Sequence, residues 1–97
     1  MPLCGGISDG HKEATPEVQT LCDKVKEAVE TKIGKPLQEF TAKVYKTQVV
    51  AGTNFFVKVH AGSDSFLHLR IYRDLKGTVS LHGVQEKKSV ADELTYF

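Results

Sequence analysis

Few side chains in this sequence could act as nucleophiles, acid–base groups or metal ligands. Catalysis needs a nucleophile or an acid–base pair that a second residue holds in position. Cys4 lies beside two glycines near the N-terminus and Cys22 falls on an apolar stripe, so neither is placed as a nucleophile. Asp92 and Glu93 are adjacent rather than on one face, and we expect both to be solvated. We therefore predict that the protein is not an enzyme.

The histidines do not have the spacing of a metal site, such as two histidines four residues apart on a helix. They are His11, His60, His68 and His82. His60 and His68 flank one predicted turn and could face each other across two strands, but we expect both to be exposed on a sheet face. Gly5-Gly6 precedes no strand–helix unit of the kind that binds phosphate. We predict neither a metal nor a cofactor.

The charge balance argues against nucleic acid and anionic membranes as partners. The 97 residues include 13 basic and 12 acidic side chains, mixed along the chain, and the net charge is +1. No apolar run reaches the length of a membrane span, and residues 1–6 lack the basic start and apolar stretch of a secretory signal. If the chain is complete, we expect it to be cytoplasmic. We also expect its two cysteines to be unbridged, because a bridge would tie a terminal tail to a core position.

The segment Gln48-Val49-Val50-Ala51-Gly52 places apolar side chains where a hairpin tip is usually polar. The residues on either side of it alternate as strands do. Tips are normally built from Gly, Asn, Asp, Pro and Ser, so exposed valines here would indicate a partner surface that covers them. The alternative is one long strand with a bulge at Gly52 and with the valines in the core. The pattern alone does not decide between the two interpretations.

A helix is predicted before this segment and must support it. Residues 1–12 carry three glycines and one proline, and we expect a flexible entry with at most a short strand near Ile7. Thr15 can cap a helix that begins at Pro16, and Gly34 can end it. The predicted helix has roughly 17 to 19 residues. Its apolar stripe, at spacings of three and four, consists of Val18, Leu21, Cys22, Val25, Ala28, Val29 and Ile33.

The rest of the chain has the period of two that strands show. The predicted strands are Phe40–Thr47, Phe55–Val59, Phe66–Tyr72 and Thr78–Gln85. We read residues 61–64 and 73–77 as turns, 86–89 as a charged linker and 94–97 as an apolar terminus that can pack down. One helix followed by consecutive antiparallel strands predicts an α+β fold with the helix on one sheet face. No repeat or second domain is visible, so residues 1–97 are predicted to form one domain.

The tip segment has the Gln-x-Val-x-Gly form of the cystatins, and the chain resembles the stefins, the single-domain cystatins without disulfides. The other matching segments are Gly5–Ser8, Ala14–Glu17, Lys46–Thr47, Ala51–Val59 and Asp92–Phe97. The resemblance implies the cystatin fold, in which a bent antiparallel sheet of four to five strands wraps around one long helix. It also implies a tight, reversible, intracellular inhibitor of papain-like cysteine proteases of the cathepsin type, which we expect to be a monomer.

The resemblance further implies three protease-binding segments along one edge. They comprise Leu3, Cys4 and Gly5 in the N-terminal trunk, Gln48, Val49, Val50, Ala51 and Gly52 in the first hairpin, and Leu75 and Lys76 in the second. Together they imply a wedge that occludes the active-site cleft without covalent chemistry. Without the resemblance, the trunk would be read as a disordered terminus with no role.

One departure from the stefin pattern affects the second hairpin. Stefins usually carry Leu-Pro there, whereas Leu75 is followed by Lys76-Gly77 in a shorter loop. Lys76 therefore brings a charge to a rim that stefins leave apolar. The alternative function is a cystatin-like scaffold that binds a protein other than a protease through the apolar tip.

Overall fold

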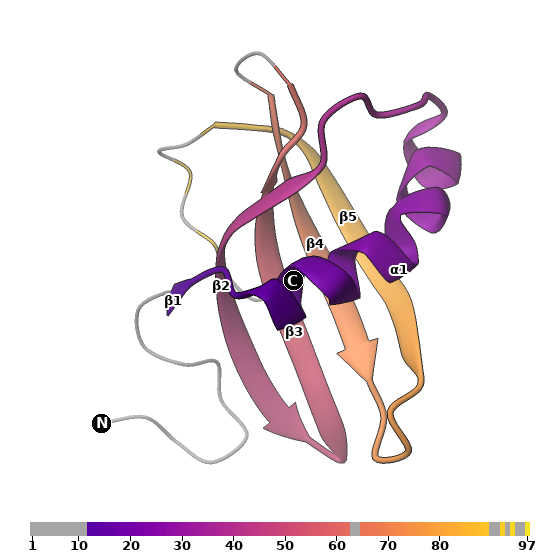
Figure 1. Cartoon of the computed structure of the whole chain (residues 1–97), viewed down its shortest axis with the longest axis vertical. Helices are drawn as coiled ribbons and strands as arrows, with labels where there is room; N and C mark the ends of the chain where they lie inside the picture. The colour runs from indigo at the N-terminus through magenta and orange to yellow at the C-terminus, as the bar shows by residue number, and fades with distance from the viewer. Residues whose placement is uncertain (1–11, 63–64, 90–91, 93, 95–96) are drawn as a thin grey trace.

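The computed structural model of the chain describes residues 12–62, 65–89, 92, 94 and 97. One helix, α1 (Pro16–Ile33), lies across one face of a five-stranded antiparallel sheet (Figure 1). The strands stand side by side in chain order: β1 (Lys12–Glu13), β2 (Thr41–Val50), β3 (Gly52–His60), β4 (Phe66–Arg73) and β5 (Val79–Lys88). The predicted α+β class, with one helix against an antiparallel sheet, is confirmed.

The ends of α1 lie where the sequence predicts them. Thr15 has an extended backbone, and its hydroxyl accepts a hydrogen bond of 3.2 Å from the Val18 N–H, while Pro16 takes the first helical position. Gly34 closes the helix with φ of 81°. In the part of the chain that the structure describes, no helix is long and apolar enough to cross a membrane.

The buried stripe of α1 is narrower than predicted. Its buried members are Val18, Leu21, Cys22, Val25 and Val29. Ala28 is exposed, contrary to prediction, and Ile33 is half-buried. At about 100° per residue, Ala28 falls at the margin of the stripe.

All four predicted strands are longer than the sequence predicts. β3 begins three residues earlier, at Gly52, and β4 gains one residue. β2 runs on to Val50 because its residues keep pairing with β3, with Gln48 opposite Asn54. β5 continues to Lys88, so residues 86–88 belong to a strand and not to a linker. A register shift accompanies this extension, and Lys87 has a positive φ of 59° there. The structure also adds β1, a two-residue strand paired with Val44 and Tyr45, while the strand considered near Ile7 lies outside the described residues.

The main core lies between α1 and the sheet. Alternate residues of β3 and β4 point toward the helix stripe: Phe55, Val57, Val59, Leu67, Leu69 and Ile71. All six are buried. The alternation of apolar residues predicts which face of these strands is buried, and the structure confirms it.

The opposite sheet face carries a second, smaller cluster built on the C-terminal residues. Phe56 is fully buried against Phe97, with ring centroids 5.8 Å apart and planes at 69°. The Arg70 guanidinium donates a hydrogen bond of 2.9 Å to the Phe97 carbonyl, and Leu94 is buried. The prediction that the apolar terminus packs down is confirmed for these two residues, while positions 95 and 96 lie outside the described residues.

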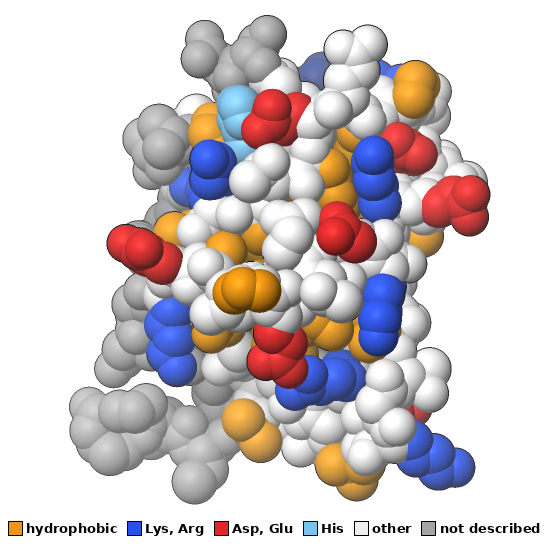
Figure 2. Space-filling view, viewed as in Figure 1, with side chains coloured by type: hydrophobic (Ala, Val, Ile, Leu, Met, Phe, Trp, Pro, Cys, Tyr) orange, Lys and Arg blue, Asp and Glu red, His pale blue; other side chains and the backbone are white. Residues whose placement is uncertain are grey.

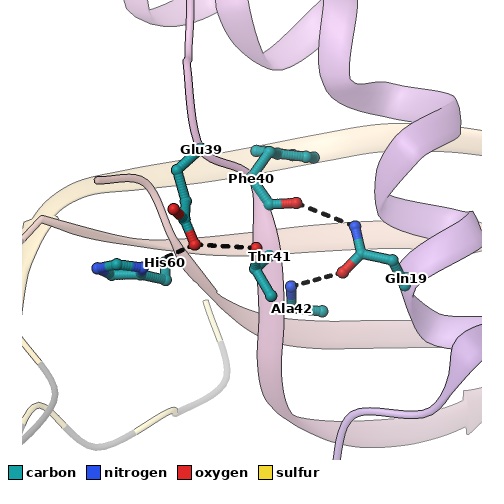
Figure 3. Close-up of polar contacts among 6 residues, drawn as sticks. All are labelled: Gln19, Glu39, Phe40, Thr41, Ala42 and His60. Atoms are coloured by element: carbon teal, nitrogen blue, oxygen red, sulfur yellow. Dashed lines mark hydrogen bonds and ion pairs between the residues drawn. The ribbon is translucent and has the colours of Figure 1, made fainter. Parts of the chain in front are cut away.

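Gln19 ties the helix to the start of β2 (Figure 3). Its side-chain amide donates to the Phe40 carbonyl at 3.0 Å and accepts from the Ala42 N–H at 2.8 Å. The side chain thus pairs with β2 as a neighbouring strand would. Beside it, the Glu39 carboxylate contacts His60 Nδ1 at 3.0 Å, and this hydrogen bond lowers the pKa of Glu39.

His68 is buried, contrary to the prediction of an exposed histidine. It lies opposite Lys58 and Gln85 on the sheet face that the C-terminal residues cover, and neither ring nitrogen has a hydrogen-bond partner. Burial first, and then the charges of Lys58 and Lys88, lower the pKa of His68 from 6.5 to about 4, against a smaller opposing effect of Asp92. The sequence around His68 predicts a solvent-exposed sheet face, because it does not show that residues far along the chain pack on this face.

We expect acid to destabilise the fold through His68. Its folded pKa lies below its unfolded pKa, so protons bind the unfolded chain more tightly. Stability is then unaffected above pH 6.5 and falls between pH 6.5 and about 4, by roughly 2 kcal/mol. Urea unfolding of the wild type and of His68→Gln at pH 7 and pH 4.5 measures this. An equal loss of stability in both proteins between the two pH values would contradict the assignment.

Candidate functional site

The first hairpin ends in a very tight tip. Val50 of β2 still pairs with Gly52 of β3, so that Ala51 alone lies between the paired residues. Gly52 has φ of 106°, a conformation that side-chain-bearing residues rarely adopt. The hairpin prediction is correct, and the alternative of one long strand with buried valines is excluded by their exposure.

The large hydrophobic side chains that remain exposed in the described part of the chain gather at one end of the molecule. They are Val49 at 64%, Val50 at 45% and Leu75 at 83% exposure. The β2–β3 tip and the β4–β5 loop both lie at the lower end of the long axis in Figure 1. Figure 2 shows apolar side chains at that end and mixed acidic and basic side chains across the helix face. A concentration of exposed apolar surface of this kind is typical of protein contact sites.

The second loop is held in shape by one carboxylate. Asp74 Oδ1 accepts hydrogen bonds of 2.9 Å from the N–H groups of both Lys76 and Thr78. The main chain closes the same turn, with a 3.0 Å bond from Gly77 N–H to the Asp74 carbonyl. This Asx-type turn presents Leu75 at the tip of a loop with little freedom.

The two tips touch each other. A Cβ atom built on Gly52 would lie 2.5 Å from the Arg73 carbonyl oxygen and 3.0 Å from the Asp74 Cα. The Tyr72 hydroxyl donates a hydrogen bond to the Ala51 carbonyl. Ala51, Tyr72, Asp74, Leu75 and Lys76 line a shallow open hollow of about 280 Å³ between the tips. The first tip therefore rests on the backbone of the second loop.

The region behind the tips is braced from the helix side. Arg73 contacts Glu17 in the first turn of α1 at 3.0 Å, and its guanidinium lies 4.9 Å from the centre of the Phe55 ring. Both groups of the ion pair are partly exposed, so its contribution to stability is small. Its geometric effect is to connect the end of β4 with the helix and the core.

The structure places seven of the ten predicted site residues, and brings them together at this end. Gln48 differs from the others because its side-chain oxygen accepts a hydrogen bond of 3.1 Å from the buried Asn54 opposite. This hydrogen bond links β2 to β3 just behind the tip. Leu3, Cys4 and Gly5 lie outside the described residues, so their placement stays a prediction.

Three residues that shape the site were not predicted from the sequence: Asn54, Tyr72 and Asp74. Asp74 and Gly77 form an Asp-x-x-Gly pattern, which is typical of turns and could have identified Asp74. Asn54 and Tyr72 lie directly opposite each other on β3 and β4. Their role depends on strand register, which no local pattern reveals.

The chemistry of the described residues does not include a reactive nucleophile at this end. Cys22 is buried in the helix–sheet core, and burial, with a smaller effect of Asp23, raises the pKa of its thiol to about 12. It behaves as a small apolar side chain. In the described ranges, no three His, Cys, Asp or Glu side chains are close enough together to hold a metal ion. What this end offers a partner is a mainly apolar surface.

Comparison with known proteins gives one consistent result. A cystatin domain model matches residues 5–93. Cystatin-B of Oplegnathus fasciatus is 46% identical, over 98% of this chain and 97% of its own. Human cystatin-A is 45% identical, over 96% of this chain and 97% of its own. Leukocyte cysteine proteinase inhibitor 1 of Sus scrofa is 41% identical, over 98% of this chain and 94% of its own.

The contact between the tips predicts that Gly52→Ala is more harmful than a matched glycine change. Gly62 also has a positive φ, of 103°, but a Cβ atom there would meet nothing within 4 Å. Gly62→Ala should therefore cost about 1 kcal/mol of stability from backbone strain alone, and Gly52→Ala at least about 1 kcal/mol more. Urea unfolding measures both. Equal losses, with unchanged NMR shifts of the Arg73 and Asp74 amides in Gly52→Ala, would show that the close contact is absent.

Proposed function

Since this chain belongs to the cystatin family, we propose that it is a reversible, tight-binding inhibitor of papain-like cysteine proteases. The observation that carries the proposal is the pair of touching hairpin tips with Val49, Val50 and Leu75 exposed on them. The two tips form a narrow edge at one end of the molecule (Figure 1). An edge of this shape fits a cleft better than a flat surface. The chain is an inhibitor domain and not an enzyme.

Inhibition would act by occlusion. Ala51 would lead the edge into the active-site cleft, with the valines of β2 on one side and Leu75 on the other. Neither tip carries a group that reacts with a catalytic thiolate. A substrate cannot enter while the edge fills the cleft, and the inhibitor is released unchanged.

The affinity would come from burying apolar surface on a preorganised edge. Each of the three exposed side chains can contribute on the order of 1 kcal/mol or more when covered. Because Gly52, Asp74 and the Tyr72 hydroxyl already fix the tips, little conformational entropy is lost on docking. Most of the gain from desolvation is then available as affinity.

The remaining predicted contacts belong to the same proposal. The trunk residues Leu3, Cys4 and Gly5 would lie along the non-primed subsites, where Gly5 would allow the chain to turn away from the catalytic cysteine. Lys76, which is exposed beside Leu75, would meet the rim of the cleft with its charge. We further propose proteases of the cathepsin type as the targets, a cytoplasmic location, and a monomer formed by residues 1–97 as a single domain.

Titration of a papain-like endopeptidase with the purified protein tests the proposal. We expect one-to-one, reversible inhibition, with no effect on serine proteases or metalloproteases. Val50→Asp should weaken inhibition by at least about 2 kcal/mol, because a carboxylate would be desolvated against an apolar wall.

Gln38→Asp is the matched control, since it adds the same charge at an exposed position in the segment between α1 and β2, at the other end of the molecule (Figure 1). It should inhibit as the wild type does. Inhibition by Val50→Asp at the wild-type level, with an unchanged circular dichroism spectrum, would exclude the tip as the binding edge. A wild type that leaves every papain-like protease active would favour the scaffold alternative.

A further inference from the structure

Resting on the proposed function, we propose that Tyr72 is a positioning residue of the inhibitory edge. Its hydroxyl gives the Ala51 carbonyl oxygen a hydrogen-bond donor that stays with the tip when the protease cleft excludes water. Tyr72 would act from behind the tip, and it is not one of the apolar side chains that enter the cleft.

The Tyr72 ring is held on both sides. It lies on β4, directly opposite Asn54 of β3, and packs against His82 of β5, with ring centroids 5.3 Å apart and planes tilted by 38°. The His82 ring in turn contacts the Ser80 hydroxyl at 3.1 Å. A ring fixed in this way directs its hydroxyl to a defined point, and that point is the carbonyl at the apex of the neighbouring hairpin.

The glycine beside that carbonyl is what lets the hydroxyl approach. A Cβ atom on Gly52 would lie 2.8 Å from the Tyr72 hydroxyl oxygen, so a side chain there would push the hydroxyl away. The positive φ of Gly52 turns the Ala51 peptide toward β4. The glycine therefore fits the tip to Tyr72 as well as to the Arg73 carbonyl.

The hydrogen bond matters more in the complex than in the free protein. Ala51 is exposed, and in the free protein water can replace a missing donor. In a cleft that excludes water, a main-chain carbonyl without a donor carries its full desolvation penalty. Loss of the hydroxyl should therefore leave folding almost unchanged and should destabilise the complex.

Tyr72→Phe tests this directly, because it removes the hydroxyl and keeps the ring on His82. We expect the dissociation rate from a papain-like endopeptidase to rise about tenfold. The association rate should stay within about twofold, and the urea midpoint of the free protein should not change. Tyr45→Phe is the matched control: Tyr45 lies on β2, opposite Val57 and packed on Phe55, and should inhibit as the wild type does.

The outcomes separate the inference from the function it rests on. A wild type that inhibits, with Tyr72→Phe dissociating at the same rate, would overturn the role of Tyr72 and leave the proposed function intact. A fall in the urea midpoint of Tyr72→Phe, with an unchanged dissociation rate, would show a role in folding instead and would also overturn it. Failure of the wild type itself to inhibit would overturn both proposals.

Discussion

The site depends on the contact between the backbone of Gly52 and the backbone of Arg73 and Asp74. A side chain at position 52 would force the backbone to shift, because a Cβ atom would lie 2.5 Å from a carbonyl oxygen. This contact joins two hairpin tips that are about twenty residues apart in sequence into one edge. Without it, the position of one tip relative to the other would have to be fixed on binding, with the entropy loss that this brings.

The rest of the fold places that edge and keeps it rigid. Consecutive antiparallel pairing brings the β2–β3 and β4–β5 connections to the same end of the sheet. The helix braces β4 through Glu17 and Arg73, and Gln19 fastens the start of β2. The sheet is packed on both faces, by the helix on one and by Leu94 and Phe97 on the other. A chain of 97 residues therefore obtains two clusters, whereas its length alone suggests one modest core.

What the sequence predicts correctly is encoded locally. Thr15, Pro16 and Gly34 set the helix ends by their own backbone preferences, and strict alternation identifies the strand faces. The burial of His68 is missed because nothing in the sequence around it shows that a residue as distant as Asp92 lies near its sheet face. Tyr72 is missed because the hydrogen bond it makes depends on which residues face each other across two strands. The apolar tip is detectable in the sequence because it departs from the usual composition of a turn, and functional sites often depart from local rules.

The central claim is that both tips enter one cleft together in the shape they have in the free protein. A crystal structure of the protein bound to a papain-like protease measures this most directly. The account predicts an intact tip and an unmodified catalytic cysteine. It also predicts that Val50 and Leu75 lie in the cleft together, with the Gly52–Arg73 backbone contact unchanged. A covalent bond to that cysteine, a cleaved tip, or one tip in the cleft with the other displaced from it would contradict the account.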